Sequence, residues 1–168
     1  RDDVESRGLG DVYKRQVLYV SLVNISAGSD LTGQLTDGFA QYAHLTKKQQ
    51  VNLLTGLIIN ETANADEQYV YASELKLLAA VSAQQLDVIL MDTAARDQLQ
   101  DEEYFLDLRT LDADFSSLDE LSADGLTLDI SDTPFIAQAG FEESVYLGVI
   151  ANAPHPERAA AYIRYLLK

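Results

Sequence analysis

The sequence contains no cysteine among its 168 residues. This absence excludes disulfide bonds, thiolate metal ligands and cysteine nucleophiles, and it is compatible with export from the cytoplasm. Glycine is sparse, at nine residues, and no glycine-rich loop of the GxxxxGK[ST] or GxGxxG kind follows a strand-like run. No apolar run approaches the ~20 residues that cross a bilayer, so we expect no membrane span in this chain.

Basic residues are few: 12 Lys and Arg stand against 27 Asp and Glu, which gives a formal net charge of -15. Such a surface repels phosphate backbones, and no basic stripe with interleaved aromatic residues is present, so we expect no nucleic-acid partner. Anionic membrane surfaces are disfavoured for the same reason. The charge predicts a solvated acidic surface, and the alternative is a surface that binds cations or cationic partners.

Residue patterns for catalysis are also missing. The two histidines, His44 and His155, show neither metal-ligand spacing nor an obvious partner, and no GxSxG elbow is present. Asp92 follows a strand-like run, as a receiver phosphoacceptor would, but Asn24 follows the first such run, where a receiver needs an acidic pair. The acidic residues do not have the spacing of a calcium loop. We therefore expect no enzyme activity, no cofactor and no metal site.

Four apolar runs, at residues 17–23, 51–59, 86–91 and 144–151, alternate with segments of helical periodicity. Runs that are apolar throughout are typical of strands covered on both faces. The sequence therefore predicts an α/β fold with three layers, in which a mostly parallel sheet has helices on both faces. We expect the last strand to run in the same direction as the first three, and residues 17–168 to form one domain.

Helices are predicted between these runs. Leu31, Leu35, Phe39 and Tyr42 recur at helical spacing after the first strand. Asn64 is expected to cap a second helix, and a short third helix is expected at residues 94–100. The remaining residues up to 143 form an acidic connection along one sheet edge. The buried face of the second helix is predicted to consist of Leu75, Leu78, Ala79 and Ser82.

The last helix is predicted most clearly. Pro156 suits its first position, and Glu157 suits its first turn. An apolar face is formed by Ala159, Ala160, Ile163, Leu166 and Leu167.

Residues 1–16 differ from the rest, because they are polar and follow neither strand nor helix periodicity. Their second half, GDVYKRQ from Gly10, resembles translated sequencing-adapter residues of the kind found in metagenomic assemblies. A flexible native arm is the alternative. We expect a disordered or artefactual tail and exclude it from the fold.

The end of the chain resembles type 2 extracellular solute-binding proteins, in which a glycine-bearing strand leads into a helix rich in alanine and aromatic residues. The resemblance lies in SVYLGVIANAPHPERAAAYIRYLL from Ser144, and it is supported by QQLDVILMD from Gln84, YFLDLRTL from Tyr104 and LYVSLVN from Leu18. It implies a periplasmic-binding-protein-like lobe. Members of this family hold ligand between two lobes, whereas residues 93–143 are too few for a second lobe, so the resemblance implies a single-lobe relative.

Polar residues after the predicted strands are the candidate ligand-binding residues. In open parallel sheets, ligands bind beyond the carboxyl ends of the strands. Asn60 follows the second strand there as well, and the alternative for all these residues is a role in turns and helix caps. The candidates are Asn24, Ser26, Asp92, Thr93 and Asn152.

Two functions follow from these observations. The first is a non-catalytic, extracytoplasmic solute-binding-like domain, related to the substrate-binding proteins of bacterial ABC transporters, that takes a small polar solute and contacts a membrane transporter. The second is a structural or protein-interaction domain that lacks the ligand cleft and contacts partners through Tyr69, Tyr71, Tyr162 and Tyr165. In either case the domain would lie at the cell surface or in the periplasm, with an anchor preceding Arg1.

Overall fold

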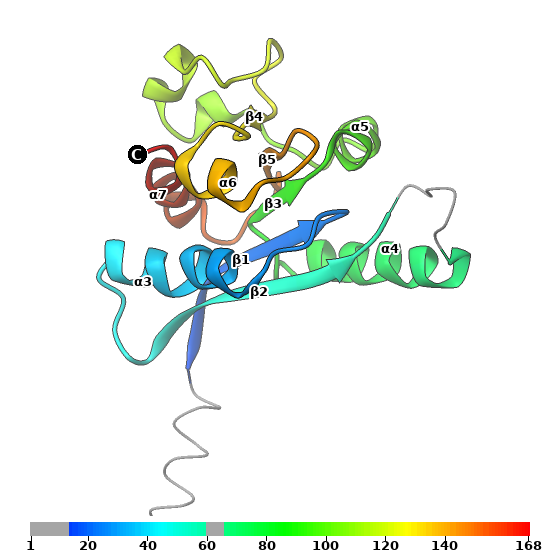
Figure 1. The fold of residues 1–168 in the computed structure, drawn as a ribbon, viewed down its shortest axis with the longest axis horizontal. Helices are drawn as coiled ribbons and strands as arrows, with labels where there is room; N and C mark the ends of the chain where they lie inside the picture. Colours follow the sequence, from blue (N-terminus) through cyan, green and yellow to red (C-terminus); the bar gives the residue numbers. More distant parts are fainter. Residues whose placement is uncertain (1–13, 60–65) are drawn as a thin grey trace, which may run out of the picture.

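The computed structural model describes residues 14–59 and 66–168, which form an α/β fold around one five-stranded sheet (Figure 1). Along the sheet the strand order is β2-β1-β3-β5-β4. The strands are β1 (Arg15–Val23), β2 (Gln49–Leu57), β3 (Val88–Met91), β4 (Leu128–Asp129) and β5 (Tyr146–Val149).

The sheet is mixed. Strand β1 pairs in parallel with β2 and with β3, but β5 is antiparallel to both β3 and β4. The prediction that the last strand joins the sheet formed by the first three is confirmed, and the prediction that it shares their direction is wrong. Tyr146 pairs with Met91, so the chain enters β5 at the end where β3 finishes, and no crossover returns it to the other end first.

The helices that surround this sheet differ in length and type. They are α2 (Ser29–Gly33), the π-helical turn η1 (Gln34–Gly38), α3 (Phe39–Tyr42), α4 (Glu67–Ser82), α5 (Thr93–Asp101), the 3₁₀ turns η2 (Leu108–Thr110) and η3 (Ala113–Ser117), α6 (Pro134–Ala139) and α7 (Pro156–Leu167).

Two apolar clusters lie against the sheet, and alternate residues of β3 belong to different clusters. Val88 and Leu90 join the cluster that contains residues of α2, η1, α3, α6 and α7. Ile89 and Met91 join the cluster that contains residues of α4 and α5. Because successive side chains of a strand point to opposite faces, these helices divide between the two sides of the sheet.

The α2, η1 and α3 segment is fixed by two tyrosines of α7. A π-helical turn replaces the usual i+4 hydrogen bonds with i+5 bonds, a rare geometry in proteins. The hydroxyl of Tyr162 donates to the Leu35 carbonyl at 2.8 Å, and that of Tyr165 donates to the Gln34 carbonyl at 2.6 Å. Tyr162 is fully buried and Tyr165 almost so, which corrects the prediction that these two aromatic residues contribute to an exposed surface.

The predicted buried face of α4 is also wrong. Val70, Ser73 and Leu77 face the core, whereas Leu75 and Leu78 are each 48% exposed. Apolar residues occur on several sides of this helix, so periodicity alone could not choose between the two faces. By contrast, the predicted buried face of α7 is confirmed at four of its five residues, and Leu167 is half-buried.

Two predicted boundaries shift. Arg15 and Gln16 were assigned to the tail, but they belong to β1 and pair with Gln49 and Gln50. Residues 1–13 lie outside the described residues. The predicted cap Asn64 does too, and the observed N-cap of α4 is Asp66, which accepts a hydrogen bond from the Gln68 amide at 2.9 Å.

The acidic segment from 93 to 143 follows the sheet edge beside β5, as predicted, and adds β4 to it. A bridge from Phe105 to Ile150 holds its first half against the end of β5. In residues 14–59 and 66–168, none of the helices combines the length and hydropathy that a bilayer crossing requires.

Candidate functional site

The carboxyl ends of β1 and β3 meet at a junction built by Asn24. Its backbone is left-handed (φ 63°), a conformation that asparagine tolerates better than most residues. The side-chain amide donates to Asp92 Oδ1 at 3.0 Å, and its oxygen accepts from the Ile59 amide at 2.8 Å. Asn24 therefore ties β1 to the residues that follow β2 and β3.

This junction lies at the switch point of the sheet. After β1 the chain forms β2 on one side of β1, and it then crosses to the other side of β1 to form β3. The order of the strands therefore reverses direction between β1 and β3. Loops diverge at such a point, and open α/β sheets bind ligands there. Figure 1 shows the loop after β1 beyond the arrowhead of that strand, at this end of the sheet.

Asp92 has a structural role at the same place. It is the N-cap of α5, and its Oδ1 accepts from the Ala95 amide at 2.9 Å as well as from Asn24. The helix-cap alternative is thus observed for Asp92. Thr93 is the exposed first residue of α5 and lines neither of the hollows described next.

Three of the predicted residues come together in a shallow hollow of about 360 Å³, which we call the junction hollow. Its other wall is the loop before β5. The lining residues are Asn24, Ile25, Ser26, Asp92, Phe141, Glu142, Glu143 and Ser144.

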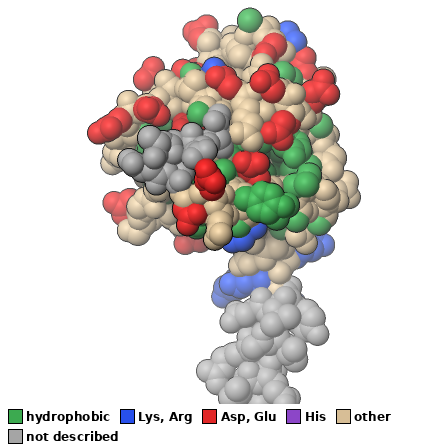
Figure 2. Space-filling view, turned by 90° about the vertical axis from the view of Figure 1, so that its right-hand side faces the viewer, with side chains coloured by type: hydrophobic (Ala, Val, Ile, Leu, Met, Phe, Trp, Pro, Cys, Tyr) green, Lys and Arg blue, Asp and Glu red, His purple; other side chains and the backbone are tan. Residues whose placement is uncertain are grey.

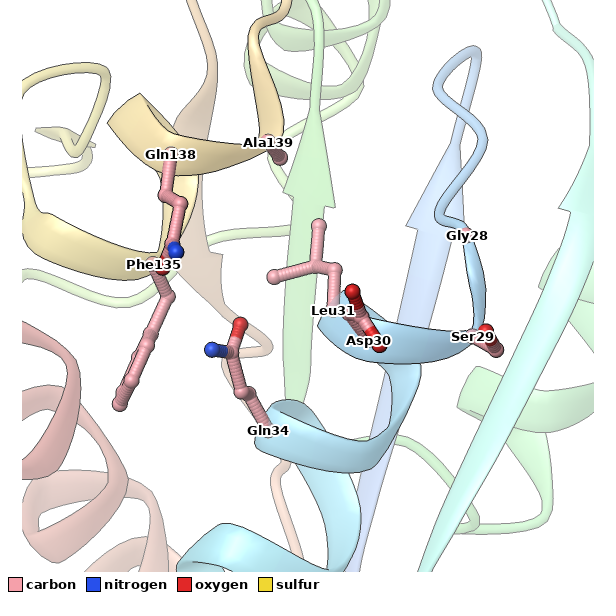
Figure 3. Close-up of a pocket in the computed structure, with 8 residues that line it drawn as sticks. All are labelled: Gly28, Ser29, Asp30, Leu31, Gln34, Phe135, Gln138 and Ala139. Atoms are coloured by element: carbon pink, nitrogen blue, oxygen red, sulfur yellow. The ribbon is translucent and has the colours of Figure 1, made fainter.

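A larger hollow of about 630 Å³ lies between α2 and α6, and we call it the α2–α6 hollow. Figure 3 shows Gln34 at the start of η1 and Phe135 and Gln138 on α6 on opposite sides of this space. Its size is within the range of small-molecule sites, and amide side chains can both donate and accept hydrogen bonds to a polar ligand. The remaining lining residues are Gly28, Ser29, Asp30, Leu31 and Ala139.

The electrostatic character of both hollows is acidic. Carboxylates line them, and no Lys or Arg of the described residues does. Anionic ligands would meet repulsion here, whereas neutral polar and cationic ligands would not. The carboxylates are Asp30, Asp92, Glu142 and Glu143.

One predicted residue lies elsewhere. Because β5 is antiparallel to β3, its carboxyl end lies at the amino end of β3, and Asn152 is therefore at the opposite end of the sheet from Asn24. Its side-chain amide donates to the Val81 carbonyl at 3.0 Å. The prediction that Asn152 shares an edge with the other four residues is wrong. Asn60 lies outside the described residues.

Asn152's end of the sheet also holds a buried carboxylate. Asp87 is fully buried and accepts from the Tyr19 amide at 2.9 Å and the His155 amide at 2.7 Å. His155 Nδ1 lies 3.0 Å from Asp87 Oδ2, and its ring stacks on Tyr19. These contacts fix the start of α7 against β1 and β3. His155 thus has a partner that its sequence position did not reveal.

The α2–α6 hollow was not predicted, because α6 was taken as part of the acidic connection. A signal was present: Thr133 precedes Pro134 at the first helical position, and Gly140 ends the helix in a left-handed conformation (φ 74°). Proline at the start and glycine just past the end are typical of a short helix.

Comparisons with known proteins give no relative. No protein-family model, curated protein or solved structure matches this chain. In the described ranges, 14–59 and 66–168, no three His, Asp or Glu side chains are grouped so that they could hold a metal ion.

Proposed function

We propose that this chain is a non-catalytic solute-binding-like domain that acts outside the cytoplasm and takes a small polar solute in the α2–α6 hollow. One observation carries the proposal: this hollow lies beside the switch point at the carboxyl ends of β1 and β3, where open α/β sheets bind ligands. The resemblance of the chain to type 2 solute-binding proteins supports the same function and a three-layer, single-lobe architecture. An ABC transporter would be the membrane partner.

The chemistry of the lining restricts the solute. Gln34 and Gln138 provide amide donors and acceptors from two different helices, and Phe135 adds an apolar side chain to the lining. Asp30 disfavours an anion. We infer that the solute is neutral or cationic and carries several hydrogen-bonding groups, as amino acids, sugars and short peptides do.

A thermal-shift screen of the full chain tests this proposal. Amino acids, sugars, polyamines, metal ions and oligopeptides are added singly, and a specific ligand is expected to raise the melting temperature in proportion to the logarithm of its excess over Kd. At a hundredfold excess the stabilisation is about 2.7 kcal/mol. For a domain of this size, that corresponds to roughly 5–10 °C.

Variants then locate the binding. Gln34→Ala combined with Gln138→Ala is expected to abolish the shift that the best compound produces. Gln41→Ala is the matched control, because Gln41 is exposed on α3 and does not line the hollow. A screen without any shift, or a shift that the double variant retains, would argue against a solute site between α2 and α6.

A second candidate function, a protein-interaction domain, is supported by a different surface. Tyr71, Leu75 and Leu78 recur at helical spacing on α4 and are 66%, 48% and 48% exposed. Figure 2 looks onto the end of the molecule near the start of α4, and hydrophobic side chains gather there beside acidic ones. Leu75→Lys with Leu78→Lys would leave solute binding intact but abolish binding to a protein partner.

A further inference from the structure

Within residues 14–59 and 66–168, strand β2 forms an edge of the sheet. No described strand pairs with its outer side, and its nine residues, QQVNLLTGL, include neither a charge nor a proline. Soluble proteins usually protect such an edge with charges, prolines, short strands or a covering segment, because the free amide and carbonyl groups accept another strand. The opposite edge is protected in this way: β4 has two residues, and Leu121 forms a bridge to Leu128.

Side chains of α4 form hydrogen bonds with backbone groups at the end of β2 and just after it. The Tyr69 hydroxyl donates to the Gly56 carbonyl, and Ser73 Oγ accepts from the Ile58 amide at 3.1 Å. Asn52 and Thr55, which precede this point, are exposed. Among the described residues, no strand pairs with the outer side of the segment from Gln49 to Thr55, so its backbone is available for pairing.

Charges of opposite sign flank this segment. Lys47 and Lys48 immediately precede β2, and both are exposed. Asp66 and Glu67, also exposed, stand at the start of α4, which the Tyr69–Gly56 contact places beside the end of β2. The edge thus has a basic start and an acidic end, in a chain whose charge is otherwise strongly acidic.

We propose that β2 is the contact surface for a second copy of this chain, paired antiparallel about a two-fold axis at Asn52. In this register Gln49 of one copy lies opposite Thr55 of the other, and the two sheets become continuous. Antiparallel pairing brings the basic start of each β2 to the acidic end of its counterpart, so the contact is self-complementary in both backbone and charge. Parallel pairing would instead place like charges together.

Sedimentation of the full chain over a wide concentration range tests for this dimer. Asn52→Lys places two lysines opposite each other at the axis, and we expect it to raise the dimer dissociation constant by more than about tenfold. Ala113→Lys is the matched control: it adds the same charge to η3, in the segment beside the opposite edge, and is expected to leave the dissociation constant unchanged. Circular dichroism melting verifies that each variant is folded.

A charge exchange tests the register independently of strand stability. Lys47→Glu alone, and Glu67→Lys alone, should each weaken the dimer by about tenfold, because each replaces an attraction with a repulsion at two symmetric places. The double variant should restore the wild-type dissociation constant. A purely structural effect on either residue would not be rescued in this way.

Two results would overturn the proposal. One is a monomer at every concentration. The other is a dimer that neither Asn52→Lys nor the charge exchange affects, which would indicate contact through another surface, such as the exposed face of α4. Solute binding between α2 and α6 uses different residues, so loss of the dimer and loss of the solute site are distinguishable.

Discussion

The two ends of the sheet use polar side chains in different ways. At the amino end of β3, Asp87 is fully buried and both of its oxygens are bonded, to Tyr19 and His155. At the carboxyl end, Asn24 and Asp92 bond to each other, but hollows lined by further polar side chains open beside them. A polar residue next to a strand therefore indicates a binding site only where its neighbours leave space for a ligand. The burial of its side chain distinguishes such a residue from one with a purely structural role.

Replacing Asp87 with alanine should give the largest loss of stability. The amides of Tyr19 and His155 would remain buried without acceptors, and we expect the free energy of unfolding to fall by roughly 3–5 kcal/mol. Urea denaturation measures this. Asp92→Ala, at the other end, removes a helix cap and should cost only about 1–2 kcal/mol. Equal losses of unfolding free energy in the two variants would contradict the proposed difference between the two ends of the sheet.

Tyr162→Phe removes one hydroxyl from the contact between α7 and η1. The Leu35 carbonyl would lose its donor in a buried environment, so we expect a loss of about 1–2 kcal/mol in urea denaturation. An unchanged free energy of unfolding would mean that the π-helical turn does not depend on this hydrogen bond.

Alkaline pH should loosen the same contact. Burial raises the pKa of Tyr162 well above that of a free tyrosine, and burial also raises the pKa of Tyr165. A raised pKa in the folded state stabilises the fold fully below the unfolded pKa of about 10, and this stability is lost as pH rises beyond it. Denaturation between neutral pH and pH values above 10 should show this loss, and Tyr162→Phe should show a smaller one. Identical pH profiles would contradict the assignment to Tyr162.

Ser21→Ala should stabilise the protein slightly. Ser21 is fully buried in β1, and its hydroxyl has no hydrogen-bond partner among the described residues. Removing an unsatisfied polar group from the interior should raise the free energy of unfolding by about 0.5–1 kcal/mol. A destabilised variant would show that the hydroxyl is satisfied in solution.

Gln138→Ala should have the smallest effect on stability. The side chain is exposed at the rim of the α2–α6 hollow, so the free energy of unfolding should change by less than about 0.5 kcal/mol. Together, Gln138→Ala and Asp87→Ala test the difference between the two ends of the sheet most sharply. The carboxyl end of β3 should tolerate the loss of a polar group, and the amino end should not.

Four of the five strands could be predicted from the sequence, because apolar runs such as the one that begins at Val17 are characteristic of a covered strand. Strand β4 could not, since its two residues form no apolar run. The direction of β5 could not be predicted, since an apolar run has the same composition whether the strand is parallel or antiparallel to its neighbour. The buried face of α4 could not be predicted either: Leu75 and Leu77 are equally apolar, and packing alone decides between them.

The candidate site was predicted only in part. Asn24 and Asp92 were found because they follow adjacent strands, whose ends must meet. Gln34 and Gln138 were missed, since they are far apart in sequence and lie on helices whose packing the sequence does not reveal. Asn152 was misplaced as a direct consequence of the reversed β5.

Amide chemical-shift mapping by NMR, with the solute that gives the largest thermal shift, tests the central claim most directly. We predict that the shifts concentrate at residues 28–34 and 134–144 and spare Tyr19, Asp87 and His155. Shifts that concentrate around Asp87 and His155, with none beside α6, would contradict a solute site at the carboxyl end of the sheet.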